Sequence, residues 1–193
     1  NYTAEELQLH EMLREYTRLS SQRARTQIEK FSAEFVLKLL KKRLFSSPAA
    51  FALTLAQHER TLRSAKGKRA EESVQSRLFE KQIEQRFTED FADDEAYEES
   101  SADAVIATSS YFQALNEEQR SLLSSMRDWS EKAAGRPDSK AEELIRRVRE
   151  IVKPNGQWSN KRVIIFTEYR ATQKWLLDLL AAEGLTGEQR LLS

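Results

Sequence analysis

The scarcity of turn-forming residues limits what this chain can fold into more than any other feature of its sequence. The chain has 193 residues but only five glycines and three prolines, whereas the two together make up about 12% of an average protein. An all-β fold needs a turn roughly every 8–12 residues, and so few turn formers leave little room for one. The sequence therefore predicts a mainly α protein, and its length predicts one domain or a domain with a further piece.

Helix starts can be placed from the residues that cap them. Apolar residues recur every three or four positions, the spacing of an amphipathic helix. Thr3–Glu6 and Asn116–Gln119 fit the capping box, in which two side chains satisfy free backbone N–H groups. Ser47-Pro48 fits a cap followed by proline at the first helical position. We expect a helical region over residues 1–91, forming a helical bundle or protrusion, and further helices over 116–160.

The formal net charge of zero conceals two blocks of opposite sign. The stretch 38–69 contains one acid and nine bases, which are Lys38, Lys41, Lys42, Arg43, Arg60, Arg63, Lys66, Lys68 and Arg69. The stretch 88–103 contains eight acids and no base. An acidic run with few large apolar residues is typical of a solvated linker, so we predict a flexible acidic linker over 92–115. The basic block is either a phosphate-facing surface or an ordinary solvated helix face.

The last part of the chain changes character. Val163–Phe166 is an unbroken apolar run, typical of a strand buried on both faces of a parallel sheet. An amphipathic helix follows and ends near Gly184, so residues 161–193 are predicted to form one βα unit. The nine residues after Gly184 are too few for another strand and its crossover, so we expect an incomplete α/β domain. Since unpaired strand edges recruit other chains, we also predict self-association through the strand 163–166.

Signals of catalysis are missing from the sequence. The chain has no cysteine, and its glycines never reach the spacing of a phosphate loop. His10 and His58 have no obvious set of partners, so each is interpreted as an interfacial side chain rather than a metal ligand. We therefore predict no catalytic residue and no metal site in this chain. No apolar run approaches the ~20 residues of a membrane span, and the expected compartment is the cytoplasm.

Three pieces of the sequence, in this order, resemble the RapA-like branch of the SWI/SNF-related helicases, which belong to superfamily two. The pieces are Tyr2-Thr-Ala-Glu-Glu-Leu-Gln-Leu-His-Glu-Met-Leu13, Leu39-Leu-Lys-Lys-Arg-Leu-Phe-Ser-Ser-Pro-Ala-Ala50, and Asp138-Ser-Lys140 followed by Lys161-Arg-Val-Ile-Ile-Phe-Thr-Glu-Tyr-Arg170. They resemble, respectively, the helix after the first ATPase lobe, the helical stretch between the lobes, and the entry into the second RecA-like lobe with its motif IV.

This resemblance implies a fragment of an ATP-dependent DNA helicase or translocase. Residues 161–193 would begin a truncated RecA-like lobe, and the ATP and Mg²⁺ sites would lie outside this chain, so the chain alone is expected to be inactive. Motif IV faces nucleic acid in this family, which makes Thr167, Tyr169 and Arg170 candidates for contact with DNA. Packing of Tyr169 on the following helix is the alternative. The basic block adds Lys38, Lys41, Lys42 and Arg43 as candidates.

Two other functions remain open from the sequence. The chain is alternatively a helical protein–protein interaction module without nucleic-acid activity, in which the charged blocks dock partners. A small self-contained enzyme is a third reading, since the chain has many serines and aspartates for a Ser-His-Asp arrangement, but no Gly-x-Ser-x-Gly motif supports it.

Overall fold

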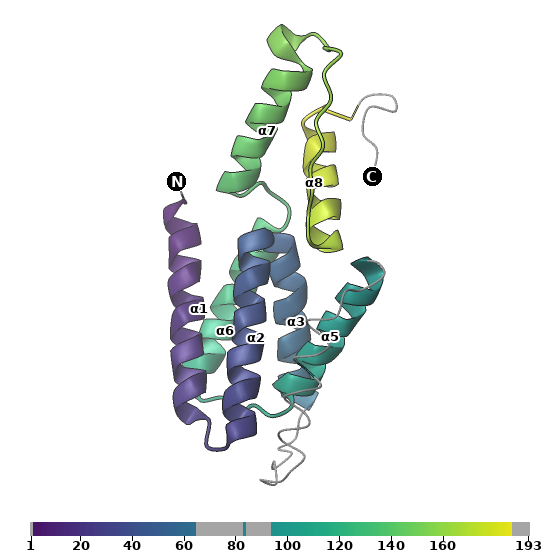
Figure 1. Cartoon of the computed structure of the whole chain (residues 1–193). Coiled ribbons are helices and arrows are strands. Elements are labelled where there is room, and N and C mark those ends of the chain that lie inside the picture. Colours follow the sequence, from purple (N-terminus) through teal and green to yellow (C-terminus); the bar gives the residue numbers. More distant parts are fainter. Residues whose placement is uncertain (1, 65–82, 84–93, 187–193) are drawn as a thin grey trace.

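A computed structural model describes residues 2–64, 83 and 94–186, and within them the protein is mainly helical (Figure 1). These residues form seven α-helices, one 3₁₀ turn and no β-strand. The helices are α1 (Ala4–Arg23), α2 (Gln27–Ser46), α3 (Pro48–Ser64), α5 (Asp94–Ser109), α6 (Glu117–Ala133), α7 (Ser139–Val152) and α8 (Arg170–Ala182), and the 3₁₀ turn η1 is Pro154–Gly156.

Helices α1, α2, α3, α5 and α6 pack together as a bundle, in which α6 runs beside both α1 and α3 (Figure 1). Its core joins residues far apart in the sequence, because Leu9, Leu40, Phe51 and Met126 are all fully buried in one apolar cluster. The expected 3–4 spacing of apolar residues is confirmed for α1, α2, α3 and α6, since their inward faces meet here. The bundle therefore unites helices from the predicted 1–91 and 116–160 regions.

The predicted helix starts are confirmed by their cap geometry. Thr3 and Asn116 each form a full capping box with the residue three positions on, and the Ser47 hydroxyl accepts the Ala50 N–H at 3.1 Å. Asp138 caps α7 by accepting the Ala141 N–H at 2.7 Å. A further capping box begins α2 at Thr26, which the sequence analysis missed.

The remaining helices, α7 and α8, with the connection 153–169 between them, form an arm at one end of the bundle (Figure 1). A second apolar cluster lies between the two helices, with Ile145 and Val148 of α7 against Trp175 and Leu179 of α8. Gly184 ends α8 with a positive φ of 67°, as a C-terminal glycine cap requires. The predicted helix and its glycine end are thus confirmed.

The prediction of an acidic linker over 92–115 is wrong for the part of it that the structure describes. Helix α5 occupies residues 94–109 and packs on α2 and α3. The physical reason is a small apolar stripe that the acids obscured: Ala104, Val105 and Thr108 are buried at helical spacing. The charge count was a poor guide, because most of the acids precede residue 100, whereas the buried positions lie between residues 101 and 109.

The predicted strand at Val163–Phe166 is not shown by the described structure. These residues are extended, but they pair with no other strand and lie at the surface. A strand needs a partner for its N–H and C=O groups, and the described residues supply none. The incomplete βα unit is therefore a helix preceded by an unpaired extended segment. The part of the predicted helical region 1–91 that follows residue 64 lies outside the described residues, except for Ile83, which is helical and buried.

Candidate nucleic-acid interface

Three lysines line one exposed stripe of α2. Lys38, Lys41 and Lys42 are all exposed, and their spacing of three and four residues places them on one helix face. Phe45 extends this stripe by one more turn and is 44% exposed. Of the four predicted basic residues, these three lysines are therefore available to a ligand. Arg43 is not, because it lies on the other side of the helix and is only 5% exposed.

Arg43 and Tyr169 instead pack against each other. The guanidinium carbon lies 3.7 Å from the centre of the Tyr169 ring, and Tyr169 is 1% exposed. A guanidinium stacked on an aromatic face combines a cation–π attraction with apolar contact. Both residues were candidates for DNA contact. The structure places them in the interface between the bundle and the arm, so packing was the better interpretation of Tyr169.

The other motif IV candidates lie at the same junction. Thr167 is half-buried, whereas Arg170 is exposed at the first position of α8. Lys42 Nζ lies 3.8 Å from a carboxylate oxygen of Glu168. Thr172 also shares hydrogen bonds with the hydroxyls of Ser46 and Ser47 at 2.6 and 2.8 Å. The two sets of predicted residues, distant in sequence, are thus brought together at one end of α2.

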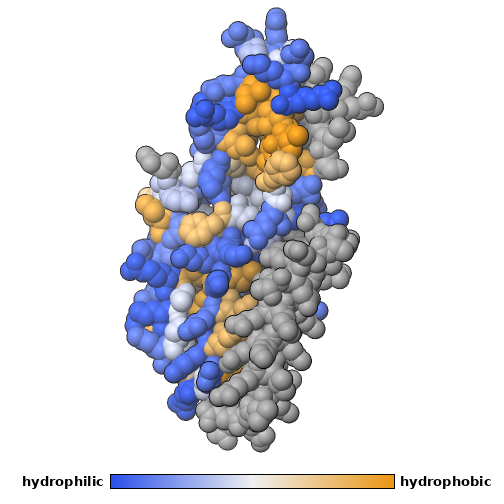
Figure 2. All heavy atoms as spheres, in the orientation of Figure 1, coloured by the Kyte–Doolittle hydropathy of each residue, from blue (hydrophilic) through white to orange (hydrophobic). Residues whose placement is uncertain are grey.

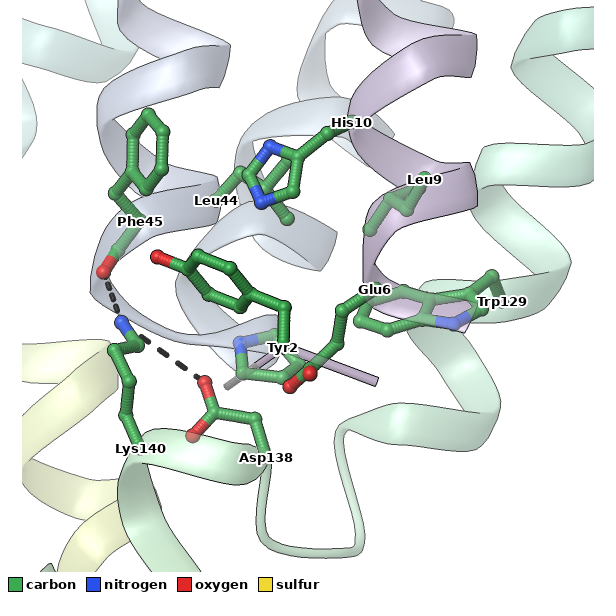
Figure 3. A pocket seen from close by; sticks show the side chains of 10 residues that line it. Tyr2, Glu6, Leu9, His10, Leu44, Phe45, Trp129, Asp138 and Lys140 are labelled. Carbon is green, nitrogen blue, oxygen red and sulfur yellow. Dashed lines mark hydrogen bonds and ion pairs between the residues drawn. The ribbon is translucent and has the colours of Figure 1, made fainter. Parts of the chain in front are cut away.

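A row of aromatic rings continues the lysine stripe onto α1, and the sequence analysis missed it. The His10 ring lies between those of Tyr2 and Phe45, with centroids 5.4 and 5.0 Å away (Figure 3). Lys140 Nζ approaches the row and donates to the Phe45 carbonyl oxygen. We call the surface formed by Lys38, Lys41, Lys42, Phe45, His10, Tyr2 and Lys140 the lysine–aromatic face. The one sequence signal for this face is the position of Phe45, seven residues or two helical turns after Lys38, which places both residues on the same side of α2.

Two carboxylates border this face and take part in helix capping. The Glu6 carboxylate accepts the Thr3 N–H at 2.6 Å and the Ser139 N–H and hydroxyl at 2.9 and 3.0 Å. Burial raises the pKa of Glu6, but these hydrogen bonds outweigh burial and the net pKa is lowered. Burial dominates at Asp138 and raises the pKa of its carboxyl. Glu6 therefore stays ionised and fixed while it joins the starts of α1 and α7.

His10 carries little positive charge within the row. Burial between Tyr2 and Phe45 lowers its pKa below the usual value, and nearby Lys41 and Lys140 act in the same direction against the carboxylate of Glu6. A neutral imidazole between two rings is a flat, weakly polar surface. The charge of the lysine–aromatic face at neutral pH therefore comes from its lysines.

A second constellation resembles a catalytic arrangement in composition only. His58 Nε2 lies 2.8 Å from the Tyr16 hydroxyl, and Nδ1 lies 2.7 Å from Ser109 Oγ. All three side chains are completely buried. Burial lowers the pKa of His58 to about 3. A serine and a histidine sealed in a core offer no access to a substrate, so this group ties α1, α3 and α5 together.

Within the described part of the chain, no cluster of three or more His, Asp or Glu side chains is placed to bind a metal ion. Among the helices that the structure describes, none has the length and apolar character needed to cross a membrane.

Comparisons with known proteins returned nothing: no family model, no curated protein and no solved structure matches this chain. The resemblance to RapA-like helicases consequently rests on the sequence motifs alone.

Proposed function

We propose that this chain binds DNA as the inter-lobe helical region of an ATP-dependent helicase or translocase of the RapA-like kind. The observation that supports DNA binding is the lysine–aromatic face, where Lys38, Lys41 and Lys42 project from one side of α2. The sequence resemblance alone supports the helicase assignment. ATP and Mg²⁺ are assigned to other parts of such an enzyme, because this sequence lacks a phosphate loop.

The chemistry of the face suits a nucleic-acid backbone. Duplex DNA carries one negative charge per ~1.7 Å of axis, and lysines that neutralise phosphates release counterions. Three ammonium groups spaced over one turn of α2 can follow a run of phosphates without reading sequence. The exposed rings of Tyr2 and Phe45 would add stacking surfaces for unpaired bases, which bind aromatic side chains regardless of sequence. Binding should therefore be weak, independent of sequence and steeply dependent on salt.

The test removes the three lysines together. In the K38A/K41A/K42A variant, fluorescence anisotropy with labelled duplex and single-stranded DNA should show weaker binding. The slope of log affinity against log salt should also fall in magnitude, by about 0.9 per lost duplex contact. The matched control is R146A/R147A/R149A, which removes three exposed charges from α7, a helix that contributes only Lys140 to the face. This control should keep the original slope.

An unchanged affinity and slope in the lysine variant would refute the proposal. The helical interaction module then becomes the better assignment, and one observation favours it independently. The apolar segment Val163–Phe166 is exposed, with Phe166 at 90% and Ile164 at 77%, and a surface of this kind is typical of protein partners.

A further inference from the structure

The extended segment 162–167, which is followed by a bend at Glu168, has the side-chain alternation of a β-strand although it is paired with none. Ile164 and Phe166 are 77% and 90% exposed, whereas Val163 and Ile165 are 37% and 36% exposed. The alternation continues to Tyr169, which is buried, while its even-numbered neighbours are exposed. The odd-numbered face of the segment is therefore less exposed than the even-numbered face, although both reach solvent. Figure 2 shows a large apolar area in this part of the surface.

The backbone of this segment is unsatisfied by the rest of the described chain. Among the hydrogen bonds of the described residues, none uses a backbone N–H or C=O group of residues 162–168. An extended backbone with free donors and acceptors beside an apolar face is a template for another strand. The structure thus offers both parts of a strand-addition site: backbone groups free to hydrogen-bond with another strand, and side chains that specify which strand binds.

We propose that the segment 162–168 pairs with the same segment of a second copy of this chain, as two antiparallel strands centred on Ile165. Opposite residues in an antiparallel pair lie on the same face. Pairing must therefore match even-numbered with even-numbered positions. With Ile165 on the two-fold axis, Ile164 lies opposite Phe166 of the second copy, and Arg162 lies opposite its Glu168.

Charge complementarity selects both the partner and the register. By two-fold symmetry the Arg162–Glu168 pair forms twice. Neighbouring registers lose it: a shift of two positions one way puts Arg162 opposite Phe166, and a shift the other way puts it opposite Arg170. A parallel pair in register would stack like charges on each other. The segment is complementary to itself in one arrangement, which is why we assign a second copy as its partner.

The ribbon would have support beyond its own hydrogen bonds. An isolated pair of strands is marginal in water, but the odd-numbered face of each strand here is already less exposed in its own molecule. The outer face gains two contacts between Ile164 and Phe166, a β-branched residue against an aromatic ring, which is a favourable cross-strand pair. Pairing would also cover the most exposed apolar side chain of the described structure, Phe166.

The experiment is a charge swap followed by sedimentation velocity over a concentration series of the whole chain. R162E replaces two attractions with two repulsions and should weaken dimerisation about tenfold or more. E168R does the same across the pair and also removes the contact between Glu168 and Lys42 of its own chain, so R162E is the cleaner of the two single variants. The double variant R162E/E168R restores both pairs with reversed polarity and should dimerise within about threefold of the natural chain. K161E is the matched control, since Lys161 lies on the other face of the strand and should leave the dimer unchanged.

The outcomes separate this partner from others. A chain that is monomeric at every concentration, or a dimer that ignores both single reversals, would overturn the proposal. Failure of the double variant to recover would overturn the register. Circular dichroism should show unchanged helix content in all variants, because both charged side chains are exposed. Phe166→Ala provides a second test without any charge change, and it should also weaken the dimer.

Discussion

The bundle and the arm are both made of amphipathic helices, but they close their apolar surfaces to different extents. In the bundle, Leu40, Phe51 and Met126 are completely inaccessible to solvent. In the arm, Leu176 and Leu179 keep 8% of their surface, and the preceding segment leaves Phe166 almost fully exposed. The bundle therefore has a core with fully buried side chains, whereas the arm leaves a continuous apolar segment at the surface that a partner could cover.

The bundle and the arm are joined largely by polar contacts. Glu6 joins α1 to Ser139, and the hydroxyl of Ser47 joins the start of α3 to Thr172 of α8. Arg43 stacks on Tyr169 across the same junction. Net contributions of hydrogen bonds are modest compared with the burial of whole apolar side chains. The arm should therefore loosen under conditions that leave the bundle folded.

The largest expected effects come from substitutions that create a cavity in each region, compared by the free energy of unfolding that each one removes. Phe51→Ala should lower the free energy of unfolding by about 3–5 kcal/mol, because Phe51 is completely buried and its neighbours come from several helices. Leu179→Ala in the arm should cost less, about 2–3 kcal/mol. Urea unfolding followed by circular dichroism measures both. Equal losses in a single transition would mean that the arm and the bundle unfold as one unit.

Acid should destabilise the bundle through His58. His58 has a pKa of about 3 in the folded protein and about 6.5 when unfolded. Between these values the unfolded state binds more protons, so stability rises with pH and is lost as pH falls below 6.5. From pH 6.5 to 5 the loss from this residue should be about 2 kcal/mol.

His58→Gln should flatten that pH dependence, as measured by urea unfolding at several pH values. His10→Gln is the control, because His10 is only half-buried and its ring is at the surface of α1. A slope that survives in His58→Gln would mean that another group binds the proton.

A smaller effect is expected at the junction. Glu6→Gln replaces a carboxylate that accepts from both Thr3 and Ser139 with an amide that has a single acceptor oxygen. The loss should be about 1–2 kcal/mol and should appear as faster amide exchange at Ser139–Ala141 by NMR. Protection in the core of α3 should stay the same. Equal acceleration in both places would contradict a loosely attached arm.

The smallest effect is expected on the outer surface of α7. Arg146 forms ion pairs with Glu143 and Glu150 at 2.6 and 2.5 Å, and hydrogen bonds from Arg146 and Arg147 lower the pKa of Glu143. All three side chains are solvated, and such pairs contribute little to stability. Arg146→Ala should leave the unfolding midpoint unchanged within error. A clear loss would show that α7 depends on its surface charges rather than on Ile145 and Val148.

Much of the fold could be predicted because local signals and tertiary packing agree. Caps such as Thr3 and Asn116 are decided within four residues, so their helices were placed correctly. The differences occurred where the tertiary context decides the outcome. The acids of α5 concealed a stripe of small residues, Ala104 and Val105, that packs on the bundle. The run Val163–Phe166 has strand character, but its partner is absent from the described residues.

The candidate site was predictable only in part, for a related reason. Helical spacing placed Lys38, Lys41 and Lys42 on one face from the sequence alone. Whether Arg43 points outward depends on Tyr169, more than a hundred residues away, and no local pattern carries that information. The contact of His10 with Tyr2 and Phe45 likewise needs α1 and α2 in register.

The buried group around His58 also constrains the direction of its protons. A neutral imidazole has one N–H, so it donates on one side and accepts on the other. If Tyr16 donates to Nε2, then Nδ1 must donate to Ser109, and in the opposite tautomer both links reverse together. The orientation of a hydroxyl on α1 is therefore tied to the orientation of another at the end of α5. The three helices are therefore connected by one hydrogen-bond chain, in which neither hydrogen bond can reverse its donor and acceptor unless the other reverses too.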